Sequence, residues 1–401
     1  MKESGFKEVT RVADARERLR EVVSPVEATD RLRLARADER VVAESVSAAR
    51  DVPHYARAAM DGWAVRAEDT FGASTRSPTV LRATDEQVGP NETVRVHTGS
   101  ELPAGADAVV IIEETDTFGD EVEVMDAVAG GENVAPEGED VEAGQPLYEP
   151  GHRLRPSDLG LLRSTGVDHV ECYRRPEIAV VPTGEELVQA DPGPGEVVET
   201  NGLTVSALVE RWGGAATYRD VVTDDESALR AAVQRDLTKD VVVTTGGSSV
   251  GERDLIPEVV ADLGEVLVHG VALKPGHPCG FGVVEDTPVI MLPGYPVACI
   301  VNAVQFLRPA LKWTGHLPLE AFPTTEARLE RKIASEPGVK TFARVSLDRS
   351  GEVVTATPTR ASGSGVLSSV ALADGWVVVP EASEGIPAGE TVTVEDWEHV
   401  A

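Results

Sequence analysis

Short apolar runs alternate with helical patterns between residues 175 and about 310. The runs are continuously apolar and lie at residues 178–181, 241–244 and 289–292. Runs of this length are typical of strands that are buried on both faces. Stretches with helical spacing follow them, at residues 203–212, 228–237, 256–263 and 297–311. Strands that alternate with helices predict an α/β domain with a mostly parallel sheet and right-handed crossovers.

The first of these helical stretches carries a clear apolar stripe. Leu203, Leu208 and Trp212 fall on one side of it, and the stripe stops at Gly213 and Gly214. A glycine pair at this point suits a helix C-cap, so we expect the helix to end there.

Two other parts of the chain have a β-like pattern. From residue 72 to 150, β-branched runs alternate with turns rich in Gly, Pro and Asp, which predicts an all-β insertion. From residue 317 onward, the runs at 353–357 and 376–379 predict a small terminal β domain. Ahead of both, residues 7–23 mix apolar and charged positions in a way that fits a surface helix.

The composition is that of a folded protein with a very acidic surface. Of the 401 residues 41% are apolar, and at about 150 residues per domain the length suggests roughly three domains. The formal charge is −31, lysine is scarce, and acidic residues are spread over the whole chain. At about 1 M salt the Debye length falls to about 3 Å, so we interpret this surface as that of a halophile's protein. It is a poor partner for nucleic acid.

Cysteine and hydropathy patterns exclude further classes. Cys172, Cys279 and Cys299 show no Cys-x-x-Cys spacing, and we expect buried free thiols in a reducing compartment. The histidines form no His-Glu-x-x-His pair, which argues against a histidine zinc site. No apolar run approaches the roughly 20 residues of a membrane span, and no signal-peptide pattern opens the chain. We therefore expect a cytoplasmic protein without a membrane partner.

Unusual loops follow the three apolar runs, at residues 182–186, 244–254 and 292–296. In open parallel sheets, ligands bind where the strands end at their carboxyl edge. The middle loop combines Gly246, Gly247 and Gly251 with Ser248 and Ser249, ahead of a predicted helix. Free backbone N–H groups at such a turn suit phosphate, although a purely structural turn is an equal alternative. The loop matches neither the P-loop nor the dinucleotide-binding fingerprint.

Two charged residues near these loops are candidate ligands. Asp254 ends the middle loop, and a carboxylate beside a phosphate cradle is unfavourable unless it holds a cation or accepts from a ligand donor. Lys274 stands in a Lys-Pro-Gly turn with a restricted backbone. A solvated lysine is the alternative interpretation there.

The order of seven motifs carries a resemblance that covers residues 10 to 390. Met60-Asp-Gly-Trp-Ala64 resembles S-A-M-D-G-[YF]-A, and residues 98–110 resemble T-G-x-x-[LV]-P-x-G-A-D-A-V-V. The remaining five motifs follow in order: Gly-Glu-Asp at 138–140, Arg-Arg-Pro at 174–176 with Thr-Gly-Glu-Glu-Leu at 183–187, Gly-Gly to Asp at 246–254, Lys-Pro-Gly at 274–276 and Leu-Pro-Gly-Tyr-Pro at 292–296. The chain resembles the molybdopterin molybdenumtransferases, the MoeA or gephyrin E-domain family.

The resemblance implies a multidomain fold of α/β and β parts. It implies an N-terminal helical and extended domain (residues 1–50 with 151–174), a β-rich insertion (51–150), a molybdopterin-binding α/β domain (175–315) and a C-terminal β barrel (316–401). It also implies a homodimer and a last step of cofactor synthesis. In that step molybdate and adenylylated molybdopterin, supplied by an adenylyltransferase, give molybdenum cofactor and AMP with the help of Mg²⁺.

The resemblance also implies roles for individual residues. The catalytic set would be Asp61, Asp140, Glu186, Asp224, Asp254 and Lys274, with Glu186, Asp224 and Asp254 as Mg²⁺ ligands. The substrate-binding set would be Thr98, Gly246, Gly247, Ser248, Ser249, Gly251, Pro293, Gly294, Pro296, Arg344 and Ser364.

Several positions depart from the family pattern. Ala135 replaces an arginine, His277 replaces a lysine or arginine, Glu185 an aspartate, Tyr295 a frequent asparagine and Ala298 a serine. Two lost cations favour a non-catalytic molybdopterin-binding scaffold as one alternative. A pterin adenylyltransferase is another, but it leaves the motifs at 60–64 and 98–110 unexplained. Molybdate and tungstate both remain open as the metal source.

Overall fold

A computed structural model describes residues 9–246, 255–360 and 365–399 of the chain. It forms two compact units, one made of residues 1–29 with 173–401 and the other of residues 30–172. We call them unit 1 and unit 2. None of the helices in the described ranges is long and apolar enough to cross a membrane.

Unit 1 is built around a six-stranded sheet. The strands in spatial order are β16 (Ala215–Tyr218), β13 (Glu177–Pro182), β17 (Val241–Thr245), β21 (Thr287–Leu292), β20 (Gly280–Val284) and β18 (Glu265–His269). From β16 to β21 the neighbours run parallel, and β20 and β18 add two antiparallel pairings. The three apolar runs are therefore the central parallel strands, as the sequence predicts.

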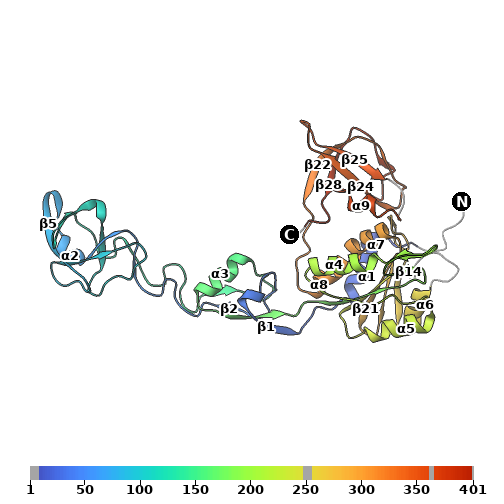
Figure 1. Ribbon diagram of the computed structural model, residues 1–401, viewed down its shortest axis with the longest axis horizontal. Coiled ribbons are helices and arrows are strands. Elements are labelled where there is room, and N and C mark those ends of the chain that lie inside the picture. Colours follow the sequence, from blue (N-terminus) through green and yellow to red (C-terminus); the bar gives the residue numbers. More distant parts are fainter. Residues whose placement is uncertain (1–8, 247–254, 361–364, 400–401) are drawn as a thin grey trace. The chain divides into compact units, whose positions relative to one another are not determined.

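Helices cover both faces of this sheet (Figure 1). One face packs against α1 (Val12–Val22), α4 (Asn201–Arg211), α7 (Pro296–Asn302), the π-helical turn η3 (Ala303–Leu307) and α8 (Arg308–Thr314). The other face packs against α5 (Glu226–Arg235) and α6 (Leu255–Leu263). Successive strand residues alternate between the two cores, because side chains of a strand point to opposite faces: Val180 and Ile290 enter the first core, Val181 and Met291 the second.

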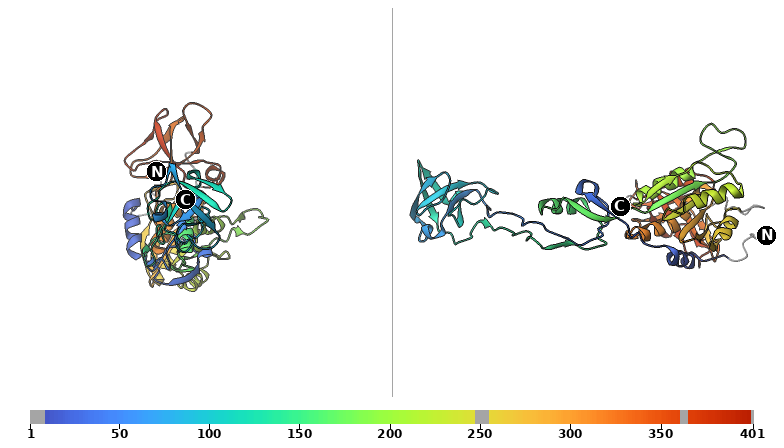
Figure 2. Two further views of the ribbon diagram at one scale, coloured as in Figure 1. Left: turned by 90° about the vertical axis from the view of Figure 1, so that its left-hand side faces the viewer. Right: turned by 90° about the horizontal axis from the view of Figure 1, so that it is seen from below.

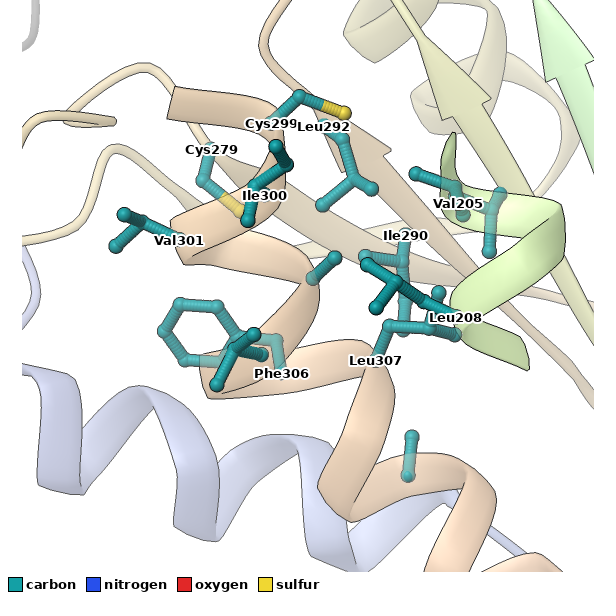
Figure 3. Packing of buried hydrophobic residues seen from close by; sticks show 14 of the residues in the cluster. Val205, Leu208, Cys279, Ile290, Leu292, Cys299, Ile300, Val301, Phe306 and Leu307 are labelled. Atoms are coloured by element: carbon teal, nitrogen blue, oxygen red, sulfur yellow. The ribbon is translucent and has the colours of Figure 1, made fainter. Parts of the chain in front are cut away.

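The first core is densely packed with aliphatic and aromatic side chains (Figure 3). Leu208 and Trp212 of the α4 region are buried in it, as their spacing predicts. Leu203 is not, since it is 62% exposed. At about 100° per residue, Leu203 lies on the opposite side of α4 from Trp212, so the predicted stripe is wrong at this residue. The buried side is formed by Gly202, Val205, Leu208 and Val209.

The C-terminal part of unit 1 is a closed β barrel. Each of its five strands pairs with two others: β22 (Thr324–Leu329), β24 (Lys340–Asp348), β25 (Thr355–Arg360), β26 (Gly375–Val379) and β28 (Thr391–Glu395). The short strand β19 (Leu273–Lys274) adds to β24, and Phe342 and Trp376 join the first core of the α/β sheet. Smaller elements are α9 (Ser368–Ala371), β23 (Ile333–Ala334) with β27 (Gly385–Ile386), and β14 (Leu187–Val188) with β15 (Val197–Val198).

Unit 2 is rich in β structure, as the sequence predicts (Figure 2). Its six-stranded sheet has the order β7 (Ala108–Ile111), β4 (Gly62–Val65), β6 (Glu92–Val96), β5 (Ser74–Thr84), β9 (Glu121–Asp126) and β8 (Thr115–Phe118). Paired short strands are β3 (Arg57–Ala58) with β10 (Val134–Ala135), β2 (Val46–Ser47) with β11 (Pro146–Tyr148), and β1 (Thr29–Arg33) with β12 (His169–Tyr173). The helices are α2 (Ala67–Thr70) and α3 (Pro156–Ser164), with 3-10 turns η1 (Leu34–Arg36) and η2 (Ile112–Glu114).

The helix α1 belongs to unit 1. Its apolar side packs on the sheet, and Arg16 donates hydrogen bonds to the carbonyl of Gln305 in the π-helical turn η3. Val12, Ala15 and Leu19 are buried in the first core. Pro309 has no N–H for the carbonyl of Gln305 four residues earlier, where the helix carries a π-turn. Arg16 of α1 donates to that carbonyl from Nε at 3.3 Å and from Nη2 at 3.1 Å. Its Nη2 also donates to the Gln305 side-chain oxygen at 2.9 Å.

We expect Arg16→Met to lower the free energy of unfolding by about 1–3 kcal/mol, because it removes donors from a carbonyl shielded in the core. Arg18→Met is the matched control, since Arg18 lies on the same helix and donates to the exposed carbonyl of Leu267. That carbonyl can bind water instead, so the control should change stability by about 0.5 kcal/mol or less. Urea denaturation measures both. Equal losses in the two variants would show that the Gln305 contact has no special weight.

Candidate functional site

The loops that follow the three central strands of unit 1 meet at one edge of the sheet. The parallel register aligns Pro182 with Thr245 and Thr245 with Leu292, so β13, β17 and β21 end at the same level. Hydrogen bonds continue past the strands, from Thr183 N to Thr245 O at 3.2 Å and from Gly246 N to Leu292 O at 3.1 Å. The loops expected to bind a ligand are thus brought together.

Close backbone packing at this edge requires glycine. Gly246 has φ +120°, and a Cβ there would lie 2.2 Å from the carbonyl oxygen of Thr183. A Cβ on Gly294 would lie 3.5 Å from the Cα of Gly246. Any side chain at 246 would therefore push the loops apart. The other predicted members of this loop, Gly247, Ser248, Ser249, Gly251 and Asp254, lie outside the described residues.

A pocket of about 520 Å³ opens between these loops. Five of the predicted site residues line it: Glu186, Asp224, Gly246, Gly294 and Pro296. Pro293 is buried at the end of β21 and is not part of the lining. Around the predicted residues stand Thr183, Leu187, Val197, Glu199, Thr200, Asn201, Leu255, Tyr295 and, from the barrel side, Gly365.

The pocket lining is acidic. It carries the carboxylates of Glu186, Glu199 and Asp224, and among the described lining residues there is no lysine or arginine. Asp224 lies on the exposed rim, yet its pKa is raised, first because neighbouring groups remove part of its water and then because Glu186 and Glu185 carry like charge. A carboxyl in this position holds a proton more readily than a free aspartate does.

Glu199 and Asn201 belong to the pocket although neither was a predicted site residue. Glu199 is 5% exposed and accepts hydrogen bonds from the backbone N of Gly202 at 2.6 Å and from the hydroxyl of Tyr218. Burial and this carboxylate raise the pKa of Tyr218 to about 12. Asn201 donates from Nδ2 to the carbonyl of Gly294 at 2.7 Å, which ties the start of α4 to the loop after β21.

Three buried hydroxyls mark the base of the loops. The Oγ1 atoms of Thr183, Thr244 and Thr245 have no hydrogen-bond partner within the described parts of the chain. Thr183 also lines the pocket. A buried hydroxyl without a partner is unfavourable, so a polar ligand at this edge would be stabilised by it.

The predicted cations Lys274 and Arg344 lie elsewhere in unit 1, and neither lines the pocket. Lys274 donates from Nζ to Glu336 at 2.9 Å, on the strand that joins the barrel. Arg344 is 1% exposed and donates to the carbonyl of Phe342 at 3.3 Å, and burial lowers its pKa. Ser364 lies outside the described residues.

Unit 2 holds the remaining predicted residues. Asp61 accepts from the backbone N of Thr98 at 2.7 Å and from its hydroxyl at 3.1 Å. These bonds lower the pKa of Asp61, with smaller contributions from His97 and Arg95, so it is ionised at neutral pH. Asp140 is exposed, in a turn whose Asp140 N and Gly138 N donate to the carbonyls of Val52 and Pro53 at 2.9 Å each. The structure therefore brings Asp61 and Thr98 together and holds Asp140 in a separate turn.

No group of three or more His, Cys, Asp or Glu side chains in the described ranges is placed to hold a metal ion. The predicted Mg²⁺ set of Glu186, Asp224 and Asp254 includes one residue outside these ranges. The like charge of Glu186 contributes, after desolvation, to the raised pKa of Asp224. A divalent cation between them would relieve that repulsion.

Three family models match consecutive parts of the chain. The MoeA N-terminal region (domain I and II) matches residues 10–166, a probable molybdopterin binding domain matches residues 179–313, and the MoeA C-terminal region (domain IV) matches residues 326–397. Together they span nearly the whole sequence, and the second covers all of the pocket lining except Gly365, which lies in the third.

Similar proteins include a putative molybdopterin biosynthesis protein of Methanocaldococcus jannaschii, 37% identical over 94% of both chains. A molybdopterin molybdenumtransferase 2 of Mycobacterium tuberculosis is 32% identical over 90% of this chain and 94% of its own. A solved molybdopterin biosynthesis MoeA protein from Pyrococcus horikoshii has a TM-score of 0.84 and 32% identity, covering 98% of this chain and 100% of its own.

The raised pKa of Asp224 predicts a gain in stability when its charge is removed. The folded state binds this proton more tightly than the unfolded chain, so the free energy of unfolding falls as pH rises from the ordinary aspartate range through the raised pKa. Asp224→Asn should therefore be more stable than the wild type at pH 7 and equal to it below the ordinary pKa of aspartate. Urea denaturation of both proteins measures the difference in their free energy of unfolding between about pH 3 and 7, the range in which carboxyl groups titrate.

The neighbouring Asp225 is the matched control with the opposite sign. It accepts hydrogen bonds from Ser227 and from the backbone N of Ala228 at the start of α5, which lower its pKa. Asp225→Ala should lose stability at pH 7. An Asp224→Asn variant that is less stable than the wild type at neutral pH would contradict the electrostatic account of the pocket.

Proposed function

The chain belongs to the MoeA family of molybdopterin molybdenumtransferases, and we propose that it inserts the metal of molybdate into adenylylated molybdopterin, with release of AMP. The observation that carries this proposal is the acidic pocket at the carboxyl edge of β13, β17 and β21, whose lining apart from Gly365 lies in the region matched by the molybdopterin-binding model. The lining offers hydroxyls, backbone groups and carboxylates from separate loops. Such convergence suits a ligand with phosphate, ring and acidic parts.

A divalent cation fits the charge of this pocket. The substrate's diphosphate and molybdate are anions, whereas the described lining carries carboxylates and no lysine or arginine. Anions would be repelled unless a cation stands between them and the protein. Glu186 and Asp224 are the residues that would hold Mg²⁺, which when bound neutralises charge on the phosphoanhydride. Oxygen ligands of this kind are the ones that Mg²⁺ prefers.

Proton handling is the second task of the pocket. Each oxo group that leaves molybdate as water takes up two protons. When no cation is bound beside it, Asp224 has a raised pKa that favours the protonated form relative to an ordinary aspartate, and it is then suited to deliver one. Thr183 supplies a buried hydroxyl donor to the bound ligand. Tungstate, with the same charge and shape as molybdate, is the alternative metal source.

A homodimer completes the proposal. Asp61 with Thr98 of one subunit would serve the pocket of the second subunit, with Asp61 kept ionised by the hydrogen bonds from Thr98. The chain would act in the cytoplasm, next to the adenylyltransferase that supplies its substrate.

We expect purified protein to form molybdenum cofactor and AMP from adenylylated molybdopterin and molybdate in the presence of Mg²⁺. The assay is run at about 1 M salt, where the Debye length of about 3 Å screens the acidic surface. Asp61→Asn should lower turnover at least about 100-fold, in the range of a lost acid or base, and leave the melting temperature unchanged. Asp116→Asn, an exposed aspartate on β8, is the control. Tight pterin binding without turnover in the wild type would instead favour a non-catalytic scaffold.

Mixing two inactive variants tests the shared site. Asp61→Asn and Asp224→Asn subunits, co-refolded, should regain up to about a quarter of wild-type activity, because half of the dimers are mixed and each has one intact site. Native mass spectrometry of one isotopically labelled variant verifies subunit exchange. Activity that stays at the level of the parent variants despite exchange would place every catalytic group within one chain.

A further inference from the structure

Tyr295 is a large aromatic residue held open at the pocket. It lines the pocket and is 60% exposed. It is also the N-cap residue of α7, where its carbonyl accepts the first hydrogen bond of the helix from Cys299 N at 2.8 Å. The backbone therefore fixes where the ring starts, while the ring itself remains accessible.

The local structure alone does not favour a tyrosine at this position. N-cap positions prefer Asn, Asp, Ser or Thr, whose short side chains accept from the first turn of the helix. Tyr295 makes no such side-chain hydrogen bond. An exposed aromatic residue that replaces a stabilising cap is a conflict between the local sequence and the fold, and such conflicts are expected at functional sites.

The barrel backbone approaches the ring of Tyr295 but leaves most of the side chain exposed. A Cβ added to Gly365 would lie 3.3 Å from Cδ1 and 3.6 Å from Cε1 of Tyr295, so the barrel backbone approaches the ring and any larger residue would press on it. Val197, which also lines the pocket, is 55% exposed. The pocket thus combines exposed apolar groups with the carboxylates of Glu186 and Asp224.

We propose that Tyr295 is a stacking platform for a planar, conjugated nitrogen heterocycle of the ligand. The inference rests on the proposed function, since both the pterin and the adenine of adenylylated molybdopterin belong to this class. Every such ring has a π-face, and stacking on an aromatic side chain binds it without needing hydrogen bonds to its edge. The carboxylates and hydroxyls of the pocket are then left for the charged part of the ligand.

The test separates the two rings by using neopterin and AMP as probes. Tyr295→Ala should weaken binding of the stacked ring about tenfold and leave the other unchanged, whereas Tyr295→Trp should bind as tightly as the wild type. Phe118→Ala, which removes an exposed aromatic residue from β8, is the control and should change neither. Fluorescence of neopterin, quenched on stacking, gives an optical signal that a merely structural role would not change.

Tyr295→Asn separates stacking from folding. Asparagine is a good N-cap, so this variant should be at least as stable as the wild type and should still lose about tenfold in affinity. Unchanged affinity for both probes in the Ala and Asn variants would overturn the proposal, as would a wild type that binds neither probe. If the Tyr295 variants lose probe binding but the wild type shows no metal insertion, the stacking role of Tyr295 is supported and only the proposed function is refuted.

Discussion

The site depends on the parallel pairing of β13, β17 and β21. Because these strands end at the same level, the backbone segments that follow them pack closely together. A Cβ on residue 246 would lie 2.2 Å from the carbonyl oxygen of Thr183, so only glycine fits there. The pocket opens between these loops and is lined by Thr183, Gly246 and Gly294 among others. The glycine requirement is therefore a consequence of sheet register, and the pocket inherits its position from the most buried strands of unit 1.

The negative charges at this edge of the sheet lower the stability of the fold. Glu186 and Asp224 repel each other on the rim of a protein that already carries a formal charge of −31. In the proposed function the same two carboxylates would hold a cation, or, without one, Asp224 would hold a proton. The neighbouring Asp225 has the opposite effect, because its carboxylate caps α5 and so stabilises the fold.

The strands and their edge loops are predictable from sequence because continuous apolar runs specify strands buried on both faces, and parallel strands end together. The roles of Glu199 and Asn201 cannot be predicted in this way, because they arise from contacts to Tyr218 and Gly294, which are distant in sequence. The sequence shows the charge of Lys274 and Arg344 but not their surroundings: the first pairs with Glu336, and the second is buried in the barrel. Leu203 is apolar and yet exposed, because its position on α4 lies opposite Trp212 and outside the buried side of the helix.

The contact between Arg16 and Gln305 bears on how the chain is made. These residues are 289 positions apart, so at about 5–20 residues per second roughly 15–60 s pass between their synthesis. Unit 2 is continuous from residue 30 to 172 and has all its strands by then. The helix α1 also packs on β18 and β21, but its contacts with η3 and α8 form only after the Pro309 region has left the ribosome. The helix α1 is thus translated before unit 2, yet these partners in unit 1 are translated only after unit 2.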